Sequence, residues 1–296
     1  MFATLLGALP RPAEAADDAA WVRAAVAAQV DAGLEPISDG AGARHAADSV
    51  VERWRSTAAL TDRAVKATLV GPWTTAWRAA GEAAPEAPDA RAVLAAADGL
   101  RAIVDELAAA GCPMVEIEEL AVQHVGTDAA AREAFRAAHL RIATGVDATH
   151  LSLSILGGSA WEAGAATILD APYRSLAVDL INGPDNWNLV TRTPGDRGIV
   201  AGALDPNRRE GPELPVWAAQ YAASTRGRGL ARVGLGTGGG LEHLPWDVAI
   251  ERLNALGEAA RIAALPPGEL ADALDPRAVS SRAAATGRTR HSERRP

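Results

Sequence analysis

The stretch ARAVLAAADGLRAIVDELAAAGCPMVEIEEL, residues 90–120, contains one complete unit of the predicted fold. Residues 90–110 place Val, Leu and Ile at helical spacing in an Ala-rich segment, and the preceding Asp89 is a common helix-capping residue. Gly111 then ends the helical pattern, and residues 114–117 are short and suited to a buried strand. The stretch therefore predicts a helix followed by a strand, the repeating unit of α/β proteins.

The same alternation continues along the chain. Strand-like runs are predicted at residues 3–9, 34–38, 67–70, 114–117, 150–155, 175–181, 198–203 and 232–236. Helical periodicity separates several of them, at residues 20–32, 128–144, 216–224 and 246–264. Eight alternating strands favour parallel pairing and closure, so we predict an α/β fold, a single-domain (β/α)₈ TIM barrel over residues 1–265. A doubly wound open sheet is the alternative.

Composition limits the possible functions. The net charge of −8 gives no basis for binding nucleic acid or an anionic membrane, and no run of 18 or more apolar residues is present. Cys112 is the only cysteine, so no internal disulfide and no cysteine-based metal cluster can form. We expect a cytoplasmic protein that binds a small molecule, and a disordered tail over residues 266–296, where the apolar periodicity is lost.

Active sites of such barrels lie at the C-terminal ends of the strands, which directs attention to the polar residues there. Asp39 follows the second strand and is a candidate catalytic acid, although an acid before Gly40 also suits a turn. Arg11 and Arg44 are candidates for binding an anionic substrate, although Arg11 could equally bridge carboxylates. Trp73 and Thr74 follow the third strand and could line a substrate pocket.

The fourth and fifth strands carry the strongest acid–base candidates. Glu116 and Glu118 are two apart, so they share a face, and close carboxyl groups suit general acid–base chemistry. Glu118 is the candidate catalytic acid, and for Glu119 solvation at the surface is an equally good explanation. His150 and Ser152 also share a face, with His150 a candidate catalytic group or a hydrogen-bonded structural histidine. His139 is expected on a helix surface.

Two further features concern the last strands. Asp179 ends the sixth strand and is a candidate substrate-binding acid. The glycine run 234–240 is a weak dinucleotide motif, and it better fits a loop whose N–H groups bind an anion, with Gly236 and Gly238 as candidates. A simple glycine turn is the alternative. Lys66 lies at the start of the third strand, away from the expected active face, which argues against a Schiff-base mechanism.

Several ordered motifs resemble one known family. Residues 4–12 (TLLGALPRP) resemble T-x-x-G-S-F-P-R-P, residues 70–74 (VGPWT) resemble a G-P-x-T turn, and residues 111–119 resemble a G-x-x-x-I-Q-I-D-E-P strand. Residues 29–44 and 241–264 resemble two further segments, and His150-Leu-Ser152 stands where the family has H-x-C. Together these motifs are similar to the catalytic barrel of cobalamin-independent methionine synthase and its relatives, which include uroporphyrinogen decarboxylase.

The resemblance implies methyl transfer to a thiol that zinc activates, with a histidine, two cysteines and a glutamate as zinc ligands. This chain departs from that pattern, because Ser152 replaces one cysteine and the run 237–240 replaces the other. Asp179 stands near the position of the glutamate. A histidine with one acid is a poor zinc site, so we expect no zinc and no other cofactor.

Three functions remain open. The chain could be a diverged, metal-free acid–base enzyme that acts on a small anionic substrate, with Glu118 or Asp39 as the acid–base group and His150 assisting. It could be a methyltransferase that acts on a thiol. It could also be a non-catalytic barrel that keeps a ligand pocket without the reaction.

Overall fold

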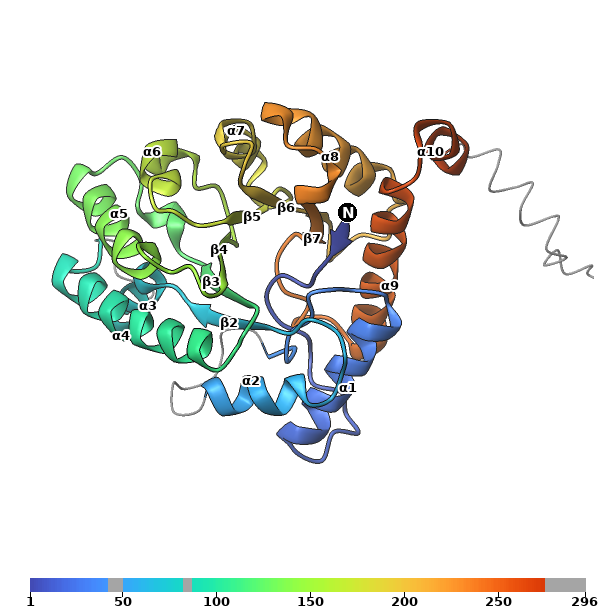
Figure 1. Ribbon diagram of the computed structural model, residues 1–296, viewed down its shortest axis with the longest axis horizontal. Coiled ribbons are helices and arrows are strands. Elements are labelled where there is room, and N and C mark those ends of the chain that lie inside the picture. The colour runs from blue at the N-terminus through green and yellow to red at the C-terminus, as the bar shows by residue number, and fades with distance from the viewer. Residues whose placement is uncertain (42–49, 82–86, 275–296) are drawn as a thin grey trace, which may run out of the picture.

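The computed structural model describes residues 1–41, 50–81 and 87–274. It has an α/β fold in which seven parallel strands form one curled sheet, as Figure 1 shows. The strands are β1 (Phe2–Ala3), β2 (Lys66–Val70), β3 (Met114–Glu119), β4 (His150–Ile155), β5 (Ser175–Asp179), β6 (Gly198–Leu204) and β7 (Val233–Thr237). Their order in the sheet is β1-β7-β6-β5-β4-β3-β2. The predicted parallel pairing of neighbouring strands is confirmed.

Helices surround the outer face of the curled sheet (Figure 1). They are α1 (Asp18–Asp31), α2 (Val50–Ala58), α3 (Pro72–Ala80), α4 (Ala90–Ala109), α5 (Ala129–Ala143), α6 (Ala165–Leu169), α7 (Trp187–Arg192), α8 (Glu213–Ser224), α9 (Trp246–Ala263) and α10 (Pro267–Leu274). Short 3-10 helices occur at η3 (Val122–His124), η4 (Trp161–Ala163), η5 (Pro184–Asn186), η6 (Thr225–Gly227) and η7 (Leu230–Arg232). Asp89 caps α4 as predicted, since its carboxylate accepts a hydrogen bond from the Arg91 N–H.

The second predicted strand, residues 34–38, does not form a regular strand. Only Ile37 makes a bridge, parallel to Val65. Pro36 lacks a backbone N–H and so cannot donate to a strand ladder. The Glu35 N–H donates to the carbonyl of Ala3 at 2.8 Å, so this segment still touches β1 on its other side. An eight-stranded closed barrel is therefore not confirmed, and the sheet itself has seven strands.

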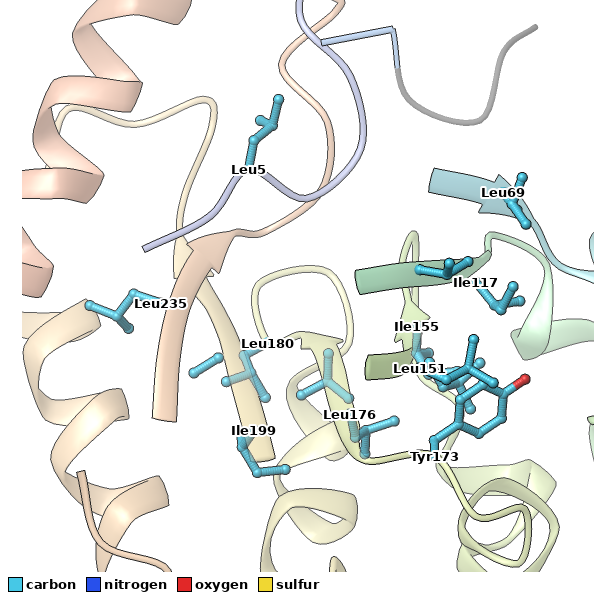
Figure 2. Close-up of a cluster of buried hydrophobic side chains, with 14 of the residues drawn as sticks. Leu5, Leu69, Ile117, Leu151, Ile155, Tyr173, Leu176, Leu180, Ile199 and Leu235 are labelled. Carbon is cyan, nitrogen blue, oxygen red and sulfur yellow. The ribbon is translucent and has the colours of Figure 1, made fainter. Parts of the chain in front are cut away.

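Two apolar clusters lie on opposite faces of the sheet. The main cluster fills the space between the sheet and the helices, with side chains such as Ile117, Leu151 and Leu235 that Figure 2 shows projecting from the strands. A small separate cluster contains Leu6, Leu156, Ala177 and Val200, and lies on the inner face. Strand alternation separates the two faces because successive side chains point in opposite directions.

The first residues of the predicted tail are helical. Residues 267–274 form helix α10. Leu270, Ala273 and Leu274 pack at the edge of the main cluster, which provides the apolar contact that holds this helix. Residues 275–296 lie outside the described residues. Within the described part of the chain, no helix is both long and apolar enough to cross a membrane.

Candidate functional site

Strand β3 directs its acids to two different faces. Glu116 is in register with Ser152 and Glu118 with Ser154, and the Ser154 position pairs onward with Ala177 of the inner cluster. Glu116 and Glu118 therefore share the inner face, in accord with their predicted spacing. Glu119 is the next residue along and faces the helices. All three side chains are buried, so contacts with other protein groups, and not contacts with water, determine their positions.

Glu118 lies at the C-terminal end of β3 and is only 1% exposed. Its Oε1 accepts a hydrogen bond from the Gly7 N–H at 3.1 Å. Gly7 has φ +76°, and a side chain there would place its Cβ 2.7 Å from the Cα of Gly240. This position accordingly requires glycine. This close approach brings together three segments at one mouth of the sheet. They are the segment after β1, the end of β3 and the loop at residues 238–240 after β7, here called the glycine loop.

Asp179 ends β5 at the same mouth and is completely buried. Its Oδ1 accepts from the backbone N–H groups of Ile181 and Asn182, both at 2.9 Å, and its Oδ2 accepts from the Asn182 Nδ2 at 2.8 Å. The Asn182 amide also donates to the carbonyl of Gly238 at 3.1 Å. Asp179 thereby organises the loop after β5 and links it to the glycine loop.

Asp39 follows the irregular second segment and is 9% exposed. Its Oδ2 lies 3.1 Å from the Nε of Arg53 on α2, and its Oδ1 accepts from the Ala41 N–H at 3.0 Å. The second contact is the local turn that an acid before Gly40 suggested. Arg53 was not anticipated, because nothing in the sequence links a residue on α2 to the end of a segment 14 positions earlier.

Glu116 does not lie in an open substrate site. Its Oε1 is 2.7 Å from the Nζ of Lys66, and the same Nζ donates to the carbonyl of Leu5 at 2.7 Å. Both side chains are fully buried. Lys66 was expected away from the active face because of its place at the start of a strand, and the structure gives it this buried partner on the inner face.

Trp73 and Thr74, predicted to line a pocket, are fully buried instead. They form the first turn of α3, where both backbone N–H groups and the Thr74 hydroxyl donate to the carboxylate of Glu119. The other partner of Glu119 is the Nε2 of His139 on α5, at 3.1 Å. The expected surface positions of Glu119 and His139 are therefore wrong, because a helix N-terminus and a buried ring satisfy the carboxylate in place of water.

His150 lies at the opposite end of the sheet from Glu118. It is the first residue of β4, and five further strand residues, about 17 Å of extended chain, separate it from the C-terminal end. Its Nε2 is 2.8 Å from the hydroxyl of Ser175, which donates to the hydroxyl of Ser152 at 2.9 Å. His150 and Ser152 share the predicted face, but a joint action of His150 with Glu118 has no support in this geometry.

The remaining predicted site residues are dispersed. Arg11 is exposed and forms an ion pair with Asp18 at 2.9 Å. This contact agrees with the alternative that Arg11 pairs with a carboxylate of the protein. Gly236 lies against Leu6, where an added Cβ would come within 2.7 Å of the leucine side chain. An added Cβ at Gly238 would lie 3.3 Å from Asp179 Oδ1. Arg44 lies outside the described residues.

The donor set does not fit the zinc site of the resembled family. Over residues 1–41, 50–81 and 87–274, no three His, Cys, Asp or Glu side chains gather as they would around a metal ion. His150 is at the wrong end of β4, and Cys112 is buried before β3, where its Sγ donates to the carbonyl of Met114. Burial raises the pKa of the Cys112 thiol to about 11, which disfavours the thiolate that zinc requires.

Comparisons with known proteins establish the fold of the chain. No protein-family model and no curated protein matches it. A B12-independent methionine synthase from Shewanella sp. W3-18-1, solved with selenomethionine, superposes with a TM-score of 0.71 at 17% identity, covering 88% of this chain and 96% of that one. A putative vitamin-B12-independent methionine synthase from Listeria monocytogenes gives 0.67 at 14% identity, covering 88% and 97%. The chain thus shares the fold of the B12-independent methionine synthases, as the ordered motifs predicted.

Proposed function

We propose that the chain is an enzyme that acts on a small anionic substrate at the C-terminal mouth of the sheet, with Glu118 as its acid–base group and without zinc. The observation that carries this proposal is the position of Glu118. It is buried on the inner face at the end of β3, and the backbone of Gly7 holds one of its carboxylate oxygens. Active sites of barrels of this type are built at that end of the strands.

The chemistry available to Glu118 follows from this arrangement. The Gly7 N–H fixes the orientation of the Glu118 carboxylate, and the low exposure of this side chain keeps bulk water from competing for proton transfer with a substrate bound at the mouth. Asp179 and Asp39 act as positioning residues in this proposal. Their carboxylates hold the loop after β5 and the side chain of Arg53, so they shape the mouth around Glu118.

The proposal includes a closed barrel in a single domain over residues 1–265, in which the segment around Ile37 takes the place of a strand between β1 and β2. Three hydrogen bonds support it: Glu35 N to Ala3 O, Ile37 N to Ala64 O and Lys66 N to Ile37 O, all between 2.8 and 2.9 Å. We also propose a cytoplasmic location, which the single cysteine Cys112 supports, and the net charge of −8 gives no basis for nucleic-acid or anionic-membrane partners.

Methyl transfer to a thiol is the second candidate, and the superposition over nearly the full length of two methionine-synthase-type proteins favours it. The purified full-length chain should be incubated with homocysteine and either methylcobalamin or a methylfolate, with and without a chelator, and the products read by mass spectrometry. Methionine formation that survives the chelator supports a metal-free methyl transfer. Formation that requires added zinc contradicts the metal-free proposal.

The role of Glu118 is tested on whichever reaction is found, with Glu118→Gln compared with Asp185→Asn, an exposed acid on η5. Glu118→Gln should reduce kcat by about 100-fold or more, the usual contribution of a positioned acid–base group, with an unchanged melting temperature. Full activity in Glu118→Gln would remove it from the mechanism. Tight ligand binding without turnover in the native chain would identify a non-catalytic binding barrel instead.

A further inference from the structure

The opposite, N-terminal mouth of the sheet contains a cavity of about 640 Å³. Its lining includes the first residues of four consecutive strands, Met114, His150, Ser175 and Gly198. The volume lies within the range of ordinary small-molecule pockets. Because parallel strands all begin at the same end of the sheet, this cavity is separate from the mouth that contains Glu118.

The floor of the cavity is polar and internally hydrogen-bonded. His150 Nε2 is 2.8 Å from the Ser175 hydroxyl, and this hydroxyl donates to the fully buried Ser152. Burial and the positive charge of Arg174 hold the pKa of His150 below its ordinary value, so its ring is neutral at pH 7. The floor therefore offers hydrogen-bonding groups without a negative charge that would repel an anion.

The rim of the cavity is predominantly cationic. Arg174, Arg197 and Arg232 line it, together with one acid, Asp196. Within the described part of the chain, the Arg232 guanidinium makes no hydrogen bond or ion pair. Arg197 uses one nitrogen, Nη1, for the carbonyls of two residues that precede β5. Arg174 uses Nη2 for Asp147, whose carbonyl accepts a hydrogen bond at 3.0 Å and whose Oδ1 lies 3.5 Å away. A guanidinium has five donors in a planar fork suited to a carboxylate or phosphate, so each of the three arginines keeps donors for a ligand.

The walls are apolar. Phe2, Pro172, Ile199 and Val200 contribute to the lining, and the apolar inner cluster lies behind Phe2 and Val200. A simple inorganic anion would leave these walls in contact with water. An organic anion with an apolar part would cover them and still reach the arginines.

We propose that this cavity is a second ligand site, which binds a small organic anion with its carboxylate or phosphate at the arginine rim and its apolar part against Phe2 and Val200. The site is independent of the proposed reaction at the other mouth, because no lining residue is shared with it. A ligand in the cavity contacts the first residues of β1 and of β3–β6 together. Because it binds only the folded chain, it stabilises the protein through mass action.

Isothermal titration calorimetry of the full-length chain with octanoate, inorganic phosphate and octan-1-ol tests the proposal. Octanoate should bind at one site per chain and more tightly than either of the other probes. Arg232→Ala and Arg174→Ala should each weaken octanoate binding by about tenfold, the loss expected for a charge-assisted hydrogen bond. Arg23→Ala on α1, an exposed arginine outside the cavity, is the matched control and should leave the affinity unchanged.

Ala231→Trp locates the site, since Ala231 is an exposed lining residue outside the hydrogen-bonded floor. This variant should block octanoate binding and keep the native melting temperature. Octanoate binding that is insensitive to Ala231→Trp and to both rim variants would overturn the proposal, as would the absence of octanoate binding. Equal affinity for octan-1-ol would overturn the assignment of an anion. Weaker binding of phosphate beside that of octanoate, with the same sensitivity to the rim variants, would support the placement of the anionic group at the arginines.

Discussion

Lys66 and Glu116 form a fully buried ion pair across β2 and β3, with Nζ 2.7 Å from Oε1 and no exposed surface on either side chain. The backbone carbonyl of Leu5 accepts a second hydrogen bond from the ammonium group. Within the described residues, Oε2 of Glu116 has no hydrogen-bond partner. The pair is thus incompletely satisfied, and its stability depends on keeping both charges together.

Glu116→Ala should therefore destabilise the protein by about 3–5 kcal/mol, because it leaves a buried ammonium group without its counter-ion. The double variant Lys66→Met/Glu116→Leu should recover most of that loss, since it removes both charges and keeps apolar volume. Urea unfolding followed by circular dichroism measures both values. A double variant as unstable as Glu116→Ala would contradict the importance of charge pairing at this position.

Glu119→Gln should lower the free energy of unfolding by about 1.5–3 kcal/mol, the net contribution of hydrogen bonds to a charged group. Glu119 accepts from the first turn of α3 and contacts His139 on α5, so the loss weakens both helix attachments. Glu106→Gln, at an exposed position on α4, is the control and should leave the unfolding curve unchanged. Equal curves for the two variants would show that Glu119 has no structural role.

His150 should make the protein less stable as the pH falls. Its pKa in the folded chain is held below the ordinary value of about 6.5 by burial and by Arg174. In the window between the folded pKa and about 6.5 the unfolded chain binds more protons, so stability decreases on acidification through that window and is unaffected above it. His150→Gln should reduce this decrease, measured as unfolding midpoints at pH 7.5 and pH 5. His243→Gln, an exposed histidine, is the control; an identical pH dependence in native chain and His150→Gln would contradict the prediction.

Cys112 should be unreactive in the folded chain. Burial raises its pKa to about 11, so only about one thiol in a thousand is ionised at pH 8, and the Sγ is also inaccessible. Iodoacetamide at pH 8 should label the native chain far more slowly than the chain in urea, as measured by intact mass. Similar labelling rates in the two states would show that the segment between α4 and β3 opens readily.

Much of the fold could be predicted from the sequence because local periodicity and burial agree. The stretch of residues 90–120 forms α4 and β3 with the predicted cap at Asp89, and the predicted strand starting at His150 begins where expected. The segment around Pro36 was predicted as a strand because it is a short apolar run. Such a run has the same pattern whether or not neighbouring segments form the hydrogen bonds of a regular strand with it, and here only Ile37 makes a bridge.

The candidate site was only partly predictable, for a related reason. The shared face of Glu116 and Glu118 follows from the two-residue period of a strand, and the structure has it. This two-residue period does not show which group each acid contacts. Glu116 forms an ion pair with Lys66, Glu118 accepts a hydrogen bond from the Gly7 N–H, and Asp39 forms an ion pair with Arg53 on α2. These partners come from distant parts of the chain.

The sequence by itself determined the alternation of helices and strands and the faces of each strand, because these follow from the local periodicity of apolar residues. The parallel sheet follows from that alternation, since each helix returns the chain to the end of the sheet where the previous strand began. Only the tertiary structure decided that Trp73 and Thr74 hold Glu119, that His150 opens to a cavity at the N-terminal mouth, and that Lys66 has a buried partner. Burial and hydrogen bonding between segments far apart in the chain depend on how the sheet curls, and no local pattern of residues encodes that curvature.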